Sequence, residues 1–283
     1  LLKEGVEAIA VCLINSYANP AHERVVGEIV AEMAPGLPVC LSSTVLPQIK
    51  EYERTSTTVV NTYLLPVISS YLRSLAGSLA QAGMQAPILV MQSNGSLTPL
   101  EEACRHPVNI VESGPAAGVV GAVARARQGA WRDVIAFDMG GTTAKASLVA
   151  DGAIARGREY EVGGSMSAGS RLIRGAGELL RIPTIDIAEV GAGGGSIAWI
   201  DAGKNLTVGP RSAGADPGPA CYGKGGTGAT VTDANLAIGR LAPSLKLAGS
   251  VALDGDLSRK VIGKIAHSLG LDLARAADGI VRI

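Results

Sequence analysis

The sequence predicts an α/β fold in which short buried strands alternate with helices. Two apolar runs, Asp133 to Asp138 and Ala144 to Val149, flank a Gly-Gly turn and are typical of adjacent strands. A run of small residues from Pro115 to about Gln128 is typical of a helix packed closely against its neighbours. Hydrophobic residues make up 47% of the 283 residues and charged residues 18%, which excludes a disordered chain and allows a sizeable core.

The start of the chain predicts a β-α-β unit. Gly5 to Ile14 is an apolar, strand-like run, and Pro38 to Ser42 is a second, shorter one. Between them, Asn19 is suited to cap a helix and Pro20 to begin it, and that helix runs to about Met33.

This unit has no partner strands upstream in the sequence. We therefore expect residues 1–50 to be the C-terminal tail of one domain and residues 51–283 to be the core of another. The chain has no initiator Met and ends in a helical run, Ala274 to Ile283, without a terminating signal. These features predict an incomplete fragment of a longer protein.

Helical residues follow from Glu51, and we expect Pro66 to begin a second helix that Gly83 ends. Pro87 to Gln92 predicts a strand, and the Asn94-Gly95 turn after it is of a kind whose central residues need positive φ.

Beyond the second of the two adjacent strands, Asp151-Gly152 predicts a turn into a third strand, Ala153 to Glu161. A helix is expected from about Thr232, capped by Thr232 or Asp233, and two more helical segments fill Leu257 to Ile283.

Composition excludes several classes of function. Lys and Arg together number 25, as do Asp and Glu, so no basic field indicates nucleic-acid binding. No apolar stretch approaches the roughly 20 residues that a membrane span needs. The four cysteines are far apart and form no C-x-x-C pair, so neither a disulfide framework nor a zinc site is indicated, and we expect a cytoplasmic protein.

The turn between the two strands has the residues of a phosphate-binding loop. Gly140 and Gly141 let successive backbone N–H groups turn toward an anion, and Thr142 and Thr143 add hydroxyl donors. Asp138 at the strand end is placed to hold Mg²⁺ or to orient a water near a γ-phosphate. These residues predict a site for ATP and Mg²⁺, with Asp138 as a metal-binding and catalytic residue; an ordinary β-hairpin is the alternative.

The segment before this loop favours the nucleotide interpretation. Glu112 to Gly118 and the small-residue helix after it resemble the turn and helix that precede the second phosphate loop of chaperone ATPases. The resemblance implies a ribonuclease H-like fold of the actin, sugar-kinase and heat-shock-chaperone type. Glu112 precedes a glycine turn and is the second candidate for a catalytic carboxylate.

A long glycine-rich segment, Gly191 to Gly228, is also a candidate functional loop. Gly193, Gly194 and Gly195 are expected to approach a phosphate or the substrate closely, and loop architecture explains them equally well. Gly218 to Lys224 nearly matches a P-loop, but it lacks the following Ser or Thr and no apolar strand leads into it.

Several other polar residues have simpler explanations. Asp216 and Cys221 lie in a rigid Pro-Gly-Pro loop, where a buried structural Cys is favoured over a reactive one. Asp233 is either an N-cap or a site residue. The three histidines are dispersed and have no partner at a metal-binding spacing.

Eight stretches of the chain, in order, are similar to the hydantoinase A / 5-oxoprolinase family. They are SYANPAHE (16–23), EYERTSTTVVNTYLLP (51–66), MQSNGSL (91–97), ESGPAAGVVGA (112–122), FDMGGTTAKASLV (137–149), VGAGGGSIAWID (190–201), VGPRSAGADPGPACYGKGG (208–226) and TVTDANLAIGRL (230–241).

The resemblance implies an ATP-dependent enzyme that opens a cyclic amide, hydantoin or 5-oxoproline, together with a second, B-type subunit. It implies that Asp138, Gly140, Gly141, Thr142 and Thr143 serve the ATP phosphates. Lys145 stands where 5-oxoprolinases tend to carry Asp, and the sequence motif around it resembles that of bacterial N-methylhydantoinase A-like subunits. This resemblance favours hydantoin or another cyclic amide over 5-oxoproline as the substrate.

Two alternatives remain open. Relatives of the family are subunits of ATP-dependent ketone carboxylases of the acetone and acetophenone type, which use the same phosphoryl transfer. A non-catalytic, nucleotide-switched binding module like the chaperones and actins is the other. The family's first phosphate loop and a later Gly-Gly-Ala-Gly-Pro segment are both absent, so we expect this fragment to hold only part of the ATP site.

Overall fold

The computed structural model describes residues 2–162, 177–244, 246–247 and 251–283. The chain forms two compact units. The first contains the described residues of 1–136, 147–165 and 174–187, and the second contains those of 137–146 and 188–283. No helix in the described part of the chain is both long and apolar enough to cross a membrane.

The first unit begins with a β-α-β arrangement, as predicted. After a short 3-10 helix, η1 (Leu2–Glu4), strands β1 (Ile9–Val11) and β2 (Val39–Leu41) run parallel and are connected through helix α1 (Ala21–Met33). The helix begins at Ala21, one residue later than predicted, with Pro20 at the N-cap position, and Asn19 accepts a hydrogen bond from the Ala21 N–H at 3.1 Å. Both strands are shorter than expected.

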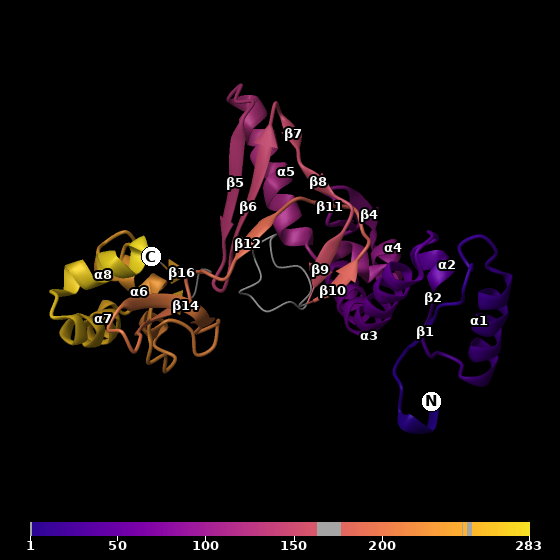
Figure 1. Cartoon of the computed structure of the whole chain (residues 1–283), viewed down its shortest axis with the longest axis horizontal. Coiled ribbons are helices and arrows are strands. Elements are labelled where there is room, and N and C mark those ends of the chain that lie inside the picture. The colour runs from indigo at the N-terminus through magenta and orange to yellow at the C-terminus, as the bar shows by residue number, and fades with distance from the viewer. Residues whose placement is uncertain (1, 163–176, 245, 248–250) are drawn as a thin grey trace. The chain divides into compact units, whose positions relative to one another are not determined.

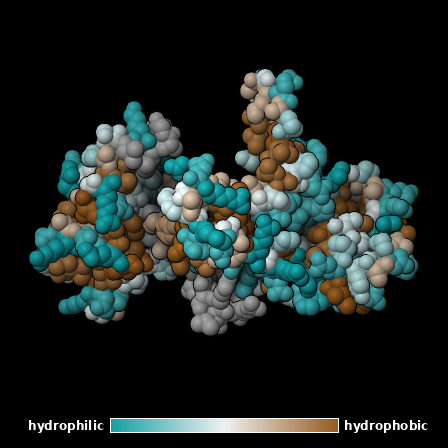
Figure 2. Space-filling model, turned by 90° about the horizontal axis from the view of Figure 1, so that it is seen from above, coloured by the Kyte–Doolittle hydropathy of each residue, from teal (hydrophilic) through white to brown (hydrophobic). Residues whose placement is uncertain are grey.

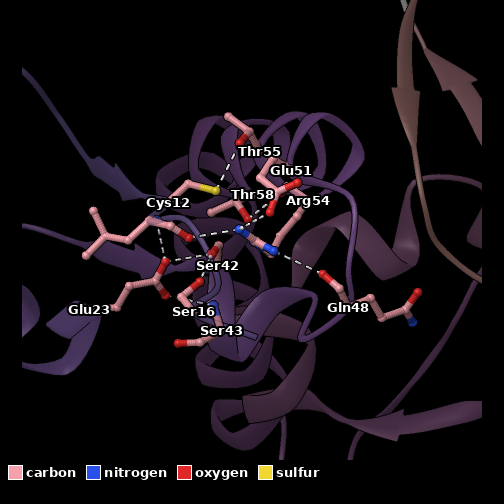
Figure 3. A network of polar contacts seen from close by, with 11 residues as sticks. Cys12, Ser16, Glu23, Ser42, Ser43, Gln48, Glu51, Arg54, Thr55 and Thr58 are labelled. Atoms are coloured by element: carbon pink, nitrogen blue, oxygen red, sulfur yellow. Dashed lines mark hydrogen bonds and ion pairs between the residues drawn. The ribbon is translucent and has the colours of Figure 1, made fainter. Parts of the chain in front are cut away.

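A buried carboxylate holds this arrangement together (Figure 3). Glu23 of α1 is fully buried and accepts hydrogen bonds from the Leu13 N–H at 2.8 Å, the Ser42 hydroxyl at 2.7 Å and the Ser43 N–H at 2.8 Å. Burial alone would raise the pKa of Glu23, but the hydrogen bonds outweigh it and lower the pKa from 4.5 to about 2. The ionised carboxylate therefore joins α1 to the segment that follows β1 and to helix α2 (Ser42–Val45).

Helix α3 (Glu51–Gln81) runs without interruption through Pro66, so the prediction of two helices here is wrong. Proline removes one backbone N–H and normally breaks a helix. Tertiary packing overrides that local preference, because α3 buries polar residues along its length and is anchored at its start by Arg54. The Arg54 guanidinium is buried and donates to the carbonyls of Leu13 at 2.8 Å and Gln48 at 3.1 Å.

A hairpin follows α3. Strands β3 (Leu89–Met91) and β4 (Leu97–Pro99) pair in antiparallel fashion around the predicted Asn94-Gly95 turn. Gly95 has φ +83°, but Asn94 does not have positive φ, because its side chain instead accepts from the Ser96 N–H at 2.8 Å. Helix α4 (Leu100–Arg105) and the 3-10 helix η2 (Pro107–Ile110) complete this region.

The predicted small-residue helix is α5 (Ser113–Gln128), and the two predicted strands are β5 (Val134–Met139) and β6 (Ala144–Ala150). Helix α5 lies alongside these strands (Figure 1), and its Val119 and Val123 share a buried cluster with Val149. The sheet has the strand order β12 (Ala188–Val190), β6, β5.

The third predicted strand, Ala153 to Glu161, is wrong as a single element. The structure divides it into β7, β8 and β9, which pair with β6, β11 and β10 respectively. The change of partner every few residues bends the chain and prevents one continuous strand. The bounds are β7 (Ala153–Ile154), β8 (Arg156–Gly157), β9 (Tyr160–Val162), β10 (Glu178–Leu180) and β11 (Thr184–Ile185).

The second unit packs three helices against a small antiparallel sheet. Strand β13 lies between β14 and β15. The core consists largely of small and branched residues, among them Ala198, Ala234, Ile262 and Ala277. The elements are β13 (Ser196–Ile200), β14 (Leu206–Ser212), η4 (Ala220–Tyr222), β15 (Ala229–Thr230), α6 (Val231–Ala237), β16 (Lys246–Leu247), β17 (Val251–Ala252), α7 (Gly255–Leu269) and α8 (Leu273–Arg282).

Hydrophobic residues also reach the surface, as the brown areas of Figure 2 show. On α3, the exposed side chains of Val59, Tyr63, Val67 and Tyr71 recur every four residues and therefore share one face of the helix. This face is an apolar surface that the described residues of the chain do not bury.

Candidate functional site

The predicted phosphate loop is a tight connection between β5 and β6. It is closed by a hydrogen bond from the Gly140 N–H to the Thr143 carbonyl at 2.9 Å. Among the described residues, the N–H groups of Gly141, Thr142 and Thr143 have no acceptor. Three successive donors without acceptors, at a turn that is largely exposed, are available to an oxyanion such as a phosphate.

The three glycines at 193–195 lie directly against this loop within the second unit. The Gly194 N–H donates to the Gly140 carbonyl at 3.0 Å, and the Gly195 N–H donates to the Gly141 carbonyl at 2.6 Å. A Cβ on Gly193 would lie 2.7 Å from backbone atoms of Gly141 and Thr142. These bonds engage the carbonyl side of the loop, which leaves its N–H groups available.

A second set of contacts supports the glycines from behind. Thr232 donates to the Gly194 carbonyl through both its N–H and its hydroxyl, each at 2.8 Å. The Gly195 carbonyl accepts from the Ala213 N–H at 2.8 Å, and the Ser196 hydroxyl accepts from the Gly193 N–H at 2.8 Å. The glycine-rich segment that begins at Gly191 therefore packs against the predicted phosphate loop and supports it.

Sequence reasoning missed the role of Thr232 because it treated that residue as a possible helix cap. The cap of α6 is Thr230, whose hydroxyl accepts from the Asp233 N–H at 3.2 Å in a capping box. Thr232 is therefore free to hold Gly194. The residues around Thr232 carry no local signal for this role.

Asp233 is a buried organiser of the second unit. Its carboxylate accepts from the N–H groups of Ala220 at 3.2 Å, Cys221 at 2.9 Å and Thr230 at 3.1 Å, and from the Ser258 hydroxyl at 2.9 Å. These contacts explain its fixed position without any ligand.

Cys221 is fully buried beside this carboxylate. Burial first, and then the negative charge of Asp233, raise the pKa of the Cys221 thiol to about 12. The thiol therefore stays protonated at neutral pH, and the expectation of a structural cysteine is confirmed.

Asp138 lies at the end of β5, exposed and next to the loop. In the described part of the chain no group of three or more His, Cys, Asp or Glu side chains could hold a metal ion. A Mg²⁺ ion at Asp138 would therefore take its other ligands from phosphate oxygens and water, which is the coordination that Mg²⁺ prefers beside a nucleotide. The role of Asp138 in holding Mg²⁺ stays a prediction.

Glu112 lies in the first unit, just before α5, whereas the loop belongs to the second. Its Oε1 accepts a hydrogen bond from the Tyr160 hydroxyl at 2.6 Å, and its own N–H donates to the Ser93 hydroxyl at 3.1 Å. A catalytic role for Glu112 alongside the loop stays a prediction.

Comparison with known sequences identifies the family of the chain. A sequence profile for hydantoinase/oxoprolinase matches residues 54–283, and one for the hydantoinase/oxoprolinase N-terminal region matches residues 1–34. The chain belongs to the hydantoinase/oxoprolinase family. The boundary that we predicted near residue 50 stays a prediction.

Relatives of this hydantoinase/oxoprolinase chain include proteins with named activities. The α subunit of caprolactamase from Pseudomonas jessenii is 40% identical over 282 residues, which are 99% of this chain and 39% of the relative. A 5-oxoprolinase from Saccharomyces cerevisiae is 39% identical over 247 residues, which are 86% of this chain and 18% of the relative. The chain thus spans two fifths or less of their lengths.

Solved structures establish the fold of this family member. A nucleotide-free acetone carboxylase, in a study of ATP-dependent acetone carboxylation, matches with a TM-score of 0.80 and 27% identity, over 99% of this chain and 38% of that chain. The ATP-dependent caprolactamase from P. jessenii matches with a TM-score of 0.70 over 99% of this chain and 39% of that chain. The predicted actin-like ATPase fold, present as a partial-length α/β fragment, is confirmed.

Proposed function

We propose that this chain is the ATP-binding part of an enzyme that opens a cyclic amide, and that it acts as the A-type subunit beside a B-type subunit. The observation that carries the proposal is the loop at 138–143, whose three consecutive N–H groups lack acceptors among the described residues while its carbonyls are bound to Gly194 and Gly195.

Each loop residue has a part in this function. The N–H groups of Gly141, Thr142 and Thr143 hold phosphate oxygens, and the Thr142 and Thr143 hydroxyls add donors. Asp138 holds Mg²⁺ directly or through water. Gly193, Gly194 and Gly195 keep the loop in place, so that its donors are oriented before the nucleotide arrives.

An unstrained cyclic amide is a poor electrophile. ATP supplies a phosphoryl group to the carbonyl oxygen of the ring, and the phosphate is then a good leaving group when water attacks the carbon. The names of two relatives, caprolactamase and 5-oxoprolinase, support a cyclic amide as the substrate class. For this chain we favour a hydantoin or another cyclic amide over 5-oxoproline.

A partner subunit is supported by two observations. The caprolactamase relative is named as an α subunit. On α3, Val59, Tyr63, Val67 and Tyr71 expose an apolar stripe, which a stable enzyme would cover with other protein.

The test is substrate-stimulated ADP release by the full-length protein with its partner subunit. Asp138→Asn keeps the size of the side chain but removes the charge that holds Mg²⁺. We expect ADP release in the presence of a hydantoin or a lactam to fall by about 100-fold or more, the scale of losing one well-placed transition-state interaction.

Asp151→Asn is the matched control, because Asp151 lies at the other end of the same two strands in an exposed ion pair with Arg132 at 3.0 Å. We expect it to leave the rate within about twofold. Equal rates for Asp138→Asn and wild type would remove Asp138 from the mechanism.

A second candidate function is ATP-dependent carboxylation of a ketone, and the match to acetone carboxylase favours it. The same ADP assay separates the candidates when acetone or acetophenone with bicarbonate replaces the cyclic amide. Stimulation by a ketone alone would select the carboxylase. ATP turnover that responds to neither substrate would instead favour the nucleotide-switched module.

A further inference from the structure

The first unit contains a cavity of about 460 Å³ that the proposed ATP chemistry does not use. Three arginines, Arg156, Arg158 and Arg181, line it together with Asn94 and Gln48. Arginine keeps its charge at all relevant pH values, so the described lining carries three positive charges. No carboxylate is among the described lining residues.

The backbone around Arg181 is fixed. Its N–H donates to the Thr57 hydroxyl of α3 at 3.0 Å, and its chain neighbours Leu180 and Ile182 are buried. On β8, Arg156 pairs in register with Ile185 of β11, which is also buried. The positions of these two arginines are therefore set by the core of the first unit.

The charge of Arg181 is poorly compensated within the described residues. In the part of the chain that the structure describes, its Nη1 is buried and has no hydrogen-bond partner, and no ion pair is found for Arg156, Arg158 or Arg181. The pKa of Glu53 is lowered mainly by a hydrogen bond from the backbone N–H of Glu53 itself. Lys50 is the next of the lowering causes, and Arg181 is the last. Within the described residues, Glu53 is bound to Lys50 at 3.2 Å and forms no ion pair with Arg181, so it offsets the charge of Arg181 only from a distance.

Neutral donors complete the lining. The Asn94 Oδ1 is occupied by the N–H and hydroxyl of Ser96, at 2.8 and 2.6 Å, which leaves its Nδ2 as a donor. The backbone carbonyl of Gln48 accepts a hydrogen bond from Arg54. The side-chain amide of Gln48 extends away from the polar contacts of Arg54 (Figure 3). Ile182 and Pro183 add apolar surface.

We propose that this cavity binds a small organic anion, through its carboxylate or phosphate oxygens. A guanidinium presents two parallel donors to such groups, and an anion at the accessible nitrogens of Arg181 would balance a charge that otherwise stands partly buried and unpaired. The volume lies in the range of small-molecule sites and exceeds the needs of inorganic phosphate, so an organic body occupies the rest. The proposal shares no residue with the loop at 138–143 and does not depend on the cyclic amide.

The test is isothermal titration of the full-length protein at constant ionic strength with glutarate, propyl phosphate and the neutral analogue glutaramide. We expect one of the two anions to bind and glutaramide not to bind. Binding of glutarate alone identifies a carboxylate ligand, and binding of propyl phosphate alone identifies a phosphate ligand. Neither anion binding at concentrations up to about 10 mM would overturn the proposal.

Variants locate the binding. Arg181→Ala is expected to weaken it by at least about tenfold, and Arg181→Lys to weaken it as well, because an ammonium lacks the two parallel donors. Arg156→Gln, a change on an exposed side chain, is expected to weaken binding without disturbing the fold. Arg127→Gln on the exposed side of α5 is the control and should bind as wild type does.

A second measurement is independent of these variants. Hydrogen exchange of the peptide that spans residues 178–187 should slow when the bound anion is added to wild-type protein. If Arg181→Lys and Arg156→Gln both bind as tightly as wild type, or if protection appears only near the loop at 138–143, the anion binds elsewhere and the proposal is wrong.

Discussion

At the residue scale, Glu23 shows how a buried charge can stabilise a fold. Its carboxylate accepts three hydrogen bonds, and the lowered pKa of about 2 means that folding favours the ionised form. Because the folded pKa lies below the unfolded value of 4.5, the contribution to stability is fully present above about pH 4.5 and is lost as the pH falls toward 2.

Glu23→Gln should therefore lower the free energy of unfolding at pH 7 by about 3 kcal/mol, since an amide leaves one of the three donors facing an N–H₂ group. The difference between variant and wild type should shrink as the pH is lowered from 4.5. Urea unfolding at several pH values measures both effects. Glu28→Gln, an exposed change on the same helix, is the control, and an equal loss in both variants would contradict this account.

The thiol of Cys221 provides a second residue-scale prediction. With its pKa raised to about 12 by burial and by Asp233, almost no thiolate exists at pH 8. Iodoacetamide should label the partly exposed Cys12 well before Cys221, and Cys221 should react only when the protein unfolds. Peptide mass spectrometry over time follows both sites. Rapid labelling of Cys221 in the folded protein would show that the loop at 216–223 is open.

At the element scale, the turn between β3 and β4 is set by contacts distant in sequence. Gly95 has φ +83°, and a Cβ there would lie 2.9 Å from Val120 of α5 and 3.1 Å from Ile185 of β11. Gly83 has nearly the same φ, +85°, with nothing within 4 Å of a Cβ. Substituting each glycine therefore distinguishes the cost of backbone strain, which both share, from the cost of steric contact, which only Gly95 has.

Gly83→Ala should cost about 1 kcal/mol of unfolding free energy, from strain at positive φ alone. Gly95→Ala should cost about 2 to 3 kcal/mol, because the neighbouring side chains must also move. Urea unfolding of the two variants side by side gives the difference. Equal costs would mean that this turn does not pack against α5 as described.

The elements also show what a sequence can and cannot predict here. Strands β5 and β6, the turn at Asp151-Gly152 and helix α5 follow from local patterns, and each is present. The continuity of α3 through Pro66 does not, because burial along the helix outweighs the missing N–H. The third predicted strand failed for a similar reason, since three different partner strands divide it.

The same limit applies to the candidate site. The loop at 138–143 was predictable because glycine, threonine and aspartate in that order have local chemistry. The hydrogen bonds that support this loop were not predictable, because bonds such as that from the Gly194 N–H to the Gly140 carbonyl join residues more than fifty positions apart. Thr232 holds Gly194 and Thr230 caps the helix, and local capping rules did not separate the two.

At the scale of the whole molecule, the chain is a partial-length member of a family whose relatives act as larger enzymes. It covers 39% of the caprolactamase subunit and 38% of the acetone carboxylase chain. Phosphate binding by the loop at 138–143 is a claim about part of an ATP site, so its test belongs in the full-length protein.

The most direct test is the affinity of the full-length protein for Mg²⁺-ATP, measured by isothermal titration. Gly193→Ala inserts a methyl group 2.7 Å from the backbone of Gly141 and Thr142, whereas Gly263→Ala in α7 meets nothing within 4 Å. We predict that Gly193→Ala weakens ATP binding by about tenfold or more while Gly263→Ala binds as wild type does. Wild-type affinity in Gly193→Ala would contradict the claim that the loop and its glycine support form one phosphate-binding unit.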